Sequence, residues 1–162
     1  MKFFYISFVC LIFNTSYANN VGSVTGFDLP RFVSLKSNES NIRIGPSKNY
    51  PITIRYTYSN FPLKIIEEHR EWRKIVDFQD NTGWIHESLI KGQRSAITIS
   101  KSSKNIFIYN SIASKKIGEI SPGLVVNLKK CKIKWCLVKS NNFRGWINKN
   151  NLWGVKKDEV FN

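Results

Sequence analysis

The histidines of this sequence are the first side chains that could act as general bases or activate a nucleophile. His69 stands in the charged run EEHRE, and His86 follows the tripeptide GWI. Neither histidine has a neighbouring serine or cysteine motif suited to nucleophilic catalysis. We therefore expect His69 to be a solvated surface residue, whereas His86 could be hydrogen-bonded in a turn or point into a groove.

Three glutamates, Glu67, Glu68 and Glu71, lie close together in the same charged run. Their hairpin-like setting is typical of a hydrated strand edge. It does not suggest a pair of carboxyl groups placed for proton transfer. We predict no catalytic residue and interpret the protein as a non-enzyme.

The cysteines could support metal or redox chemistry. Cys10 lies in an apolar N-terminal run, which leaves Cys131 and Cys136 in the rest of the chain. A zinc site needs about four ligands, and His69 and His86 are far away in the sequence. The spacing of the cysteines also differs from the C-x-x-C of a thiol oxidoreductase. In an exported protein two cysteines most simply form one disulfide, so we predict that bridge and no metal or other cofactor. A redox protein, the remaining alternative, would need a labile bridge.

The first 18 residues have the features of a secretory signal peptide. Lys2 precedes an apolar run over residues 3–13, and Ser16-Tyr17-Ala18 supplies a small-x-small ending. About 20 apolar residues are needed to span a bilayer, so this run is too short for a membrane anchor. We predict cleavage after Ala18 and a periplasmic or secreted mature chain without a transmembrane segment.

The positive charge of the chain is unevenly distributed. Residues 19–91 contain 10 Lys+Arg and 8 Asp+Glu, whereas residues 92–162 contain 14 and 3, and the whole chain has a net charge of +14. Strand alternation is expected to place Lys130, Lys132 and Lys134 on one side of a strand of the central hairpin, with Lys149 on or near that hairpin. A basic face of this kind attracts anionic polymers over long range. The alternative is a soluble face without a specific partner.

The elements that must position these side chains occur twice. TGWIHESLI (82–90) is followed 62 residues later by RGWINKNNL, and SNIRIGPS (40–47) resembles KNIFIYNS (104–111). Within each copy, short β-branched or aromatic segments are separated by turn residues. FPLKIIEE, WRKIVDF and TGWIHE are predicted as successive strands, and Ala96–Ile99 could pair as another. With no sustained helical period, the pattern indicates a duplicated small antiparallel barrel.

The order of these segments resembles the bacterial SH3-like (SH3b) domain, and the whole chain is similar to exported proteins that carry two such domains in tandem. LPRFVSLKSNESNIRIGPS, EWRKIVDFQDNTGWIHESL, KKCKIKWCLV, RGWI and LWGV carry the likeness. It implies an all-β chain with domains at 29–91 and 92–155. It also implies binding of cell-wall peptides or protein partners, without catalysis.

The alignment of the two copies makes a specific prediction about one hairpin. An offset of 63 places Cys131 over Glu68 and Cys136 over Arg73. We therefore expect a cross-strand ion pair in the first copy where the second copy has its disulfide. Because the bridge closes so short a loop, we expect only a modest chain-entropy stabilisation, below the roughly 3 kcal/mol of a 15-residue loop, and a bridge that pins the register of the hairpin.

Aromatic residues provide the candidate ligand contacts. The resemblance places Trp72 and Trp135 where the ligand-binding tryptophan of eukaryotic SH3 domains lies, although either could simply cover its barrel. Trp84 and Trp146 are expected to pack. Tyr56 and Tyr58, with Tyr50, could form an exposed patch beside Trp72. The positions that complete a proline-rich-peptide groove hold residues such as His86 and Leu89, so recognition of polyproline peptides is not expected.

These features predict a binding module of the cell envelope. Its candidate ligand-binding residues are Trp72, Tyr56, Tyr58, His86 and Trp135, and its candidate anion-binding residues are Lys130, Lys132, Lys134 and Lys149. The expected partner is a cell-wall (peptidoglycan) peptide, another anionic envelope polymer or an acidic envelope protein, and nucleic acid is not expected. The alternative is a protein-interaction subunit of a periplasmic complex.

Overall fold

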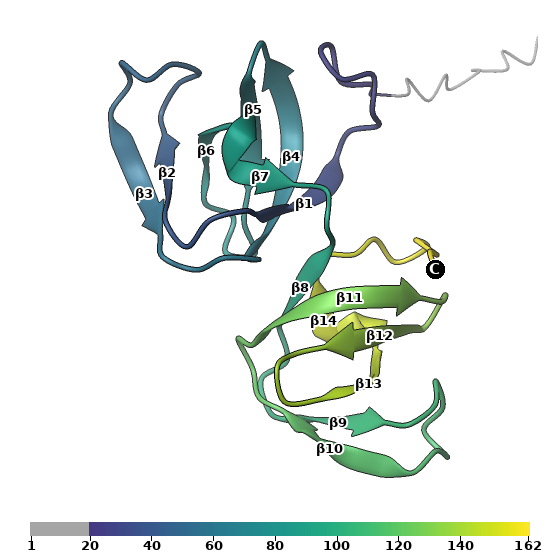
Figure 1. Cartoon of the computed structure of the whole chain (residues 1–162). Coiled ribbons are helices and arrows are strands. Elements are labelled where there is room, and N and C mark those ends of the chain that lie inside the picture. Colours follow the sequence, from purple (N-terminus) through teal and green to yellow (C-terminus); the bar gives the residue numbers. More distant parts are fainter. Residues whose placement is uncertain (1–19) are drawn as a thin grey trace, which may run out of the picture.

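A computed structural model describes residues 20–162, and the predicted signal peptide lies outside this range. Figure 1 shows two small barrels of strands that follow one another along the chain. Within the described residues no helix is long and apolar enough to cross a membrane. The expectation of an all-β chain is confirmed, because the only helices here are two short 3₁₀ turns.

The first barrel is a seven-stranded sheet with the order β3-β2-β6-β5-β4-β1-β7. A 3₁₀ turn, η1 (Glu87–Leu89), joins β6 to β7. The strands are β1 (Arg31–Leu35), β2 (Ser40–Arg43), β3 (Ile52–Tyr56), β4 (Pro62–His69), β5 (Trp72–Val76), β6 (Thr82–His86) and β7 (Ile90–Lys91).

The second barrel has the equivalent order β10-β9-β13-β12-β11-β8-β14. Its 3₁₀ turn, η2 (Lys149–Asn151), again precedes the last strand. The strands are β8 (Ser95–Thr98), β9 (Lys104–Phe107), β10 (Lys116–Ile120), β11 (Val125–Cys131), β12 (Trp135–Lys139), β13 (Arg144–Asn148) and β14 (Leu152–Trp153). The predicted duplication is therefore present strand for strand, and the expected Ala96–Ile99 segment pairs as a strand as far as Thr98.

Alternating side chains fill the two barrels. In β4 and β5, Leu63, Ile65 and Ile75 are fully buried, and in the second barrel Val126, Val138 and Ile147 occupy comparable interior positions. Each full burial of such a side chain contributes on the order of 2 kcal/mol. At Gly83 a side chain would collide with Ile42, so the glycine of the repeated GWI phrase permits close strand approach.

The two barrels pack against each other through their connecting strand. Ile97 of β8 is buried in the core cluster of the first barrel. Phe32 of β1 meets Trp153 of β14 edge to face, with 5.0 Å between ring centroids. The hydroxyls of Ser34 and Ser95 lie 2.5 Å apart in a buried hydrogen bond. β8 therefore serves as both a strand of the second barrel and a contact of the first.

The hairpin prediction from the two copies is confirmed. Cys131 pairs with Cys136 across β11 and β12, with a disulfide and a Cα–Cα distance of 4.1 Å. Glu68 pairs with Arg73 at the equivalent place in β4 and β5, and Arg73 Nε lies 3.7 Å from Glu68 Oε1. Sulfur in one copy and an ion pair in the other thus occupy the same hairpin position.

Glu68 is buried, so the expectation that this glutamate lies on a hydrated edge is wrong. The segment before β1 folds over it: Val24 N and Thr25 N each donate to Oε2 at 2.9 Å. Arg31 donates to Oε1 at 2.7 Å. Burial alone raises the pKa of Glu68, but hydrogen bonds from Thr25, Val24 and Arg31 outweigh burial and bring it down to about 2.

Candidate functional site

Three surface hollows of the first barrel adjoin His86. Three elements meet there: the loop 44–51 between β2 and β3, the turn 70–71 between β4 and β5, and η1. His86 ends β6 and caps η1, because its Nδ1 accepts a hydrogen bond from Ser88 N. The ring is thereby fixed in orientation, which confirms the turn alternative for this histidine; it also lines the hollows.

Trp72 and His86 form a ridge within this surface. Their rings meet edge to face with 5.4 Å between centroids, and the two residues pair across β5 and β6. Trp72 is only 8% exposed. It therefore covers the barrel, and its remaining exposed edge borders the hollows on both sides.

Two hollows flank this ridge. The smaller, of about 250 Å³, lies between the ridge and η1, and the larger, of about 370 Å³, lies toward the β4–β5 turn. The smaller is lined by Asn41, Arg43, Lys48, Trp72, His86, Ser88 and Leu89, and the larger by Pro46, Ser47, Lys48, His69, Arg70, Glu71, Trp72 and His86. Basic and other polar side chains, with Glu71 as the one acidic residue, thus surround an aromatic centre.

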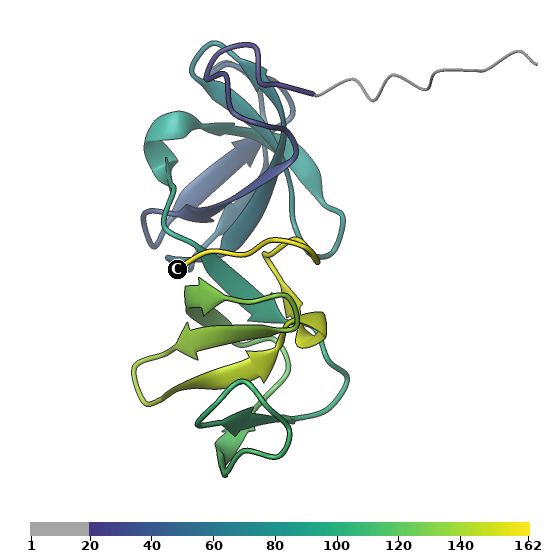
Figure 2. The same ribbon diagram turned by 90° about the vertical axis from the view of Figure 1, so that its right-hand side faces the viewer.

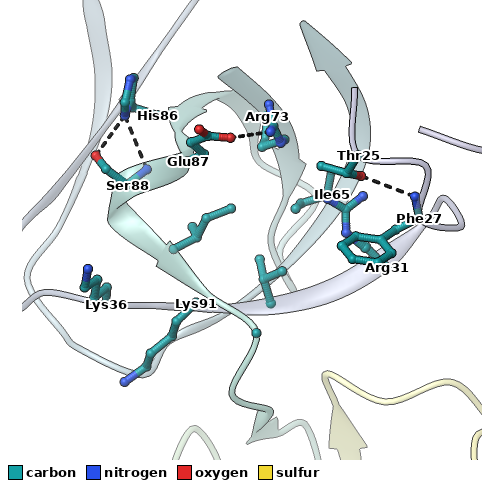
Figure 3. Close-up of a pocket in the computed structure, with 13 residues that line it drawn as sticks. Thr25, Phe27, Arg31, Lys36, Ile65, Arg73, His86, Glu87, Ser88 and Lys91 are labelled. Atoms are coloured by element: carbon teal, nitrogen blue, oxygen red, sulfur yellow. Dashed lines mark hydrogen bonds and ion pairs between the residues drawn. The ribbon is translucent and has the colours of Figure 1, made fainter. Parts of the chain in front are cut away.

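A third groove, of about 480 Å³, extends on the other side of η1 (Figure 3). Val33, Ile65 and Ile90 give it an apolar floor. Phe27 is exposed at one end, with the Arg31 guanidinium 5.4 Å from its ring centroid. The groove therefore offers apolar contact along its floor and an aromatic face at its end.

Cations dominate the rim of this surface although the first barrel is nearly neutral. Within the described part of the chain, Lys36, Lys48, Arg70 and Lys91 form no ion pair. By contrast, Arg73 is engaged by Glu87 and Glu68. These four free cations were not singled out from the sequence, because the charges are scattered over residues 36–91 and only the fold brings them together.

Tyr56 does not belong to this surface, and the expectation that it is exposed is wrong. It is 9% exposed, and its ring stacks on Phe61 with 4.9 Å between centroids. Its hydroxyl donates to Asp77 Oδ2 at 2.7 Å. Burial and this hydrogen bond raise its pKa. Asp77 also accepts from Asn81 N, so Tyr56 braces the β5–β6 turn.

The other tyrosines of the predicted patch are exposed. Tyr58 is 67% and Tyr50 44% exposed. Neither lines the three hollows. Tyr50 packs on Gly45 within its own loop, where a Cβ on the glycine would collide with the ring. The structure thus separates these tyrosines from the Trp72–His86 ridge.

The second barrel presents a different surface at the equivalent position. Trp135 is half-buried and meets Phe107 edge to face at 5.6 Å. Asn148 replaces His86 as the cap of the 3₁₀ turn and accepts from Asn150 N at 3.0 Å. The cap is therefore conserved between the copies, whereas the ring that forms the ridge is present only in the first.

The predicted lysine face requires two corrections. Lys132 and Lys134 lie in the β11–β12 turn, and only Lys130 lies in a strand, beside a bulge. The bulge and turn break the expected alternation. Lys149 is 4% exposed, and its Nζ donates to Lys157 O and Glu159 O at 3.1 and 2.7 Å. Lys149 therefore holds the C-terminal segment and cannot serve as an open anion site.

No group of three or more His, Cys, Asp or Glu side chains within residues 20–162 is arranged to hold a metal ion. His86 lies against Trp72 and bonds to Ser88, while His69 lies 6.4 Å from the Trp84 ring, centroid to centroid. Both arrangements are consistent with packing and capping.

Comparisons with known proteins agree with this architecture. A family model for the bacterial SH3 domain matches residues 36–92 and 105–154. No match was found among the curated proteins.

Solved structures give looser likenesses. NlpC2 from Trichomonas vaginalis is 12% identical with a TM-score of 0.35, and covers 76% of this chain and 48% of its own length. An NlpC/P60 family protein from Bacillus cereus ATCC 10987 is 12% identical with a TM-score of 0.34, and the shares covered are 75% and 55%. The chain spans about half the length of these proteins. The match of the family model over both barrels shows that the chain belongs to the bacterial SH3 domain family and carries two such domains in tandem.

Proposed function

We propose that this protein is a non-enzymatic binding module of the cell envelope and that its first barrel binds a carboxylate-bearing cell-wall peptide. The observation that carries the proposal is the presence of four unpaired cations, Lys36, Lys48, Arg70 and Lys91, along the hollows and the groove that adjoin His86. Lys48 borders both flanking hollows, and Arg70 borders one of them. The third groove adds Lys36 and Lys91.

The chemistry of such a surface suits a short, mixed peptide. The carboxylates of the peptide would accept charge-assisted hydrogen bonds from the lysines and arginines at the rim. Small apolar side chains would lie against Val33, Ile65 and Ile90. The basic second barrel would raise the local concentration of the protein near anionic envelope material. Export, as suggested by the N-terminal sequence, would bring the protein to that compartment.

The direct test is retention on purified peptidoglycan of a protein comprising residues 19–162, across a series of salt concentrations. Lys48→Glu should weaken binding by about tenfold, because it places a repulsive charge beside both hollows. His86→Asn keeps the cap that Asn148 shows to be compatible with this turn, but removes the ring. It should weaken binding by roughly fivefold through loss of the aromatic face.

Lys64→Glu is the matched control, because Lys64 lies on β4 of the same barrel, forms no ion pair among the described residues, and lines none of the three hollows. Retention should remain unchanged in that variant. Absence of retention at low salt would refute the cell-wall proposal. If Lys48→Glu and His86→Asn were both retained as well as the unaltered protein, the binding site would lie outside these hollows. A stoichiometric protein partner on crosslinking, without cell-wall retention, would instead support an interaction subunit.

A further inference from the structure

One corner of the second barrel combines exposed apolar side chains with lysines. The β9–β10 loop (108–115) and the β11–β12 turn (132–134) both point to the right of that barrel in Figure 1. Lys132 Nζ lies 3.4 Å from Asn110 Oδ1 and joins the two segments. Three residues of this corner are largely exposed: Tyr109 at 69%, Ile112 at 82% and Ile133 at 69%.

The same corner exists in the first barrel, and its backbone is alike. The β2–β3 and β9–β10 loops make the same three internal hydrogen bonds at an offset of 64 residues. In the first loop Ile44 N donates to Pro51 O, Ser47 N to Gly45 O, and Tyr50 N to Ser47 O. In the second loop the equivalent bonds run from Ile108 N to Lys115 O, from Ser111 N to Tyr109 O, and from Ser114 N to Ser111 O. The offset places Ile112 at the position of Lys48.

The β11–β12 turn also has an isoleucine where the first barrel has a cationic residue. Ile133 lies at the position of Arg70, because Trp72 and Trp135 begin equivalent strands. Lys48 and Arg70 line one hollow of the first barrel. Their equivalents therefore lie at one corner of the second barrel, where isoleucines occupy the positions of the two cationic side chains. We call the corner formed by Tyr109, Ile112 and Ile133 the apolar tip.

Lysines surround the apolar tip. Lys115 ends the β9–β10 loop and Lys116 begins β10, while Lys132 and Lys134 flank Ile133; all four are exposed. Glu119, the one acidic residue in 101–157, is paired with Lys116 at 2.5 Å. The tip therefore projects from a strongly positive collar.

We propose that the apolar tip docks on an anionic lipid bilayer. Attraction to a soluble polyanion would use the lysines but give no role to exposed isoleucines. A protein interface would tend to exclude lysine from its core. A bilayer accommodates both: aliphatic side chains enter the acyl boundary, tyrosine lies at the headgroups, and lysine stems extend to the phosphates. Each lysine near such a surface contributes about 1 kcal/mol.

The placement of the two barrels fits this contact. In Figure 1 the β2–β3 loop, which borders the two hollows beside the Trp72–His86 ridge, lies at the left, and the two segments that form the apolar tip lie on the right. Figure 2 shows the β2–β3 strands on the far side when that right-hand side faces the viewer. A protein held to a bilayer by its second barrel would thus leave the two hollows beside the Trp72–His86 ridge open. This inference does not depend on the cell-wall proposal.

The test is flotation of the protein comprising residues 19–162 with vesicles of phosphatidylcholine alone or mixed with phosphatidylglycerol. The apolar N-terminal run is left out because it would itself partition into lipid. Binding is expected only with phosphatidylglycerol. The exposed-residue variant Ile112→Ser/Ile133→Ser should lower the affinity at least about tenfold through lost apolar burial. Lys132→Glu/Lys134→Glu should lower it about a hundredfold.

The matched control for charge is Lys101→Glu/Lys139→Glu. These lysines are exposed, and they lie in the β8–β9 connection and at the end of β12, on the opposite side of the barrel. The control makes the same change in net charge and should lose far less affinity than the turn variant. Equal loss in both lysine pairs would overturn the proposal, since it would reflect net charge alone.

Three other results would also overturn it: absence of binding to phosphatidylglycerol vesicles, equal binding to neutral vesicles, or undiminished binding of the isoleucine variant. The last of these would point to attraction by lysines alone, as for an anionic glycan. Size-exclusion chromatography tests whether a second copy of the chain binds the apolar tip. A dimer that dissociates in Ile112→Ser/Ile133→Ser would show that a second copy covers the tip.

Discussion

Glu68 is a buried carboxylate whose ionisation is coupled to folding of the first barrel. Its pKa falls to about 2 from an ordinary value of 4.5 because Thr25, Val24 and Arg31 donate to it. A depressed folded-state pKa stabilises the protein above pH 4.5, and this stabilisation is lost as the pH falls to about 2. The size of the shift corresponds to roughly 3 kcal/mol.

We predict that Glu68→Gln lowers the free energy of unfolding by about 3 kcal/mol at neutral pH and that the deficit shrinks toward pH 2. Denaturant titrations of both proteins at a series of pH values measure this. Glu67→Gln is the control, because Glu67 is exposed and pairs only with Lys74, at 3.1 Å. A deficit that persists unchanged at pH 2 would show that packing, not ionisation, is responsible.

Lys149 shows at the same scale why residue type alone did not locate binding sites. The sequence shows one lysine among many, but the fold buries this one beside the C-terminal segment. Burial lowers its pKa. We predict that Lys149→Met leaves anion binding intact but increases amide hydrogen exchange at residues 156–162, because the two hydrogen bonds that the Lys149 ammonium donates to that segment are lost. Normal exchange there would contradict this role.

Among the elements, the β11–β12 hairpin has a dual role. Its disulfide closes a loop of only a few residues, and Cys131 also pairs its backbone with Phe161, at 2.9 and 3.1 Å. The C-terminal segment thus rests on the bridged strand. In the first barrel the segment before β1 rests on Glu68, at the equivalent position.

We predict that Cys131→Ala/Cys136→Ala lowers the free energy of unfolding by about 2 kcal/mol, as expected for so short a loop. Denaturant titration of the oxidised protein and the variant measures the difference. The protein treated with reductant is the matched comparison and should lose stability to a similar extent. No loss in either would mean that the strands hold this register without sulfur.

Across the whole molecule, the contact between the barrels decides whether they behave as one unit. Phe32 meets Trp153, and the Arg94 guanidinium lies 5.6 Å from the Phe32 ring centroid while it pairs with Glu159. Ile97 is buried against the first core. Shared burial of this kind couples the unfolding of the two barrels.

We predict that Phe32→Ala separates a single calorimetric transition into two, because it removes the ring that both Trp153 and Arg94 contact. The loss should be on the order of 2 kcal/mol for a half-buried aromatic. Phe27→Ala is the control: Phe27 is an exposed phenylalanine of the same N-terminal region. Two transitions already present in the unaltered protein would refute the coupling.

Much of the architecture followed from sequence because β-structure depends on local patterns. Alternating apolar residues, turn residues and the repeated GWI phrase were sufficient for the strands 62–69, 72–76 and 82–86 and for the duplication. The pairing of Glu68 with Arg73 also followed, since a repeat preserves register. The register of a hairpin can be predicted because it depends on the number of residues between the two paired positions.

Exposure and proximity were decided only by the tertiary structure. Tyr56 and Lys149 each carry a polar group at the end of a largely apolar side chain. Such a side chain can be exposed, or it can be buried where its polar group finds a hydrogen-bond partner. Here Asp77 is the partner of Tyr56, and backbone carbonyls of the C-terminal segment are the partners of Lys149. The cations around the Trp72–His86 ridge come from loops far apart in the chain. Local sequence determines which strands form, but the closure of the barrel determines which loops share a surface.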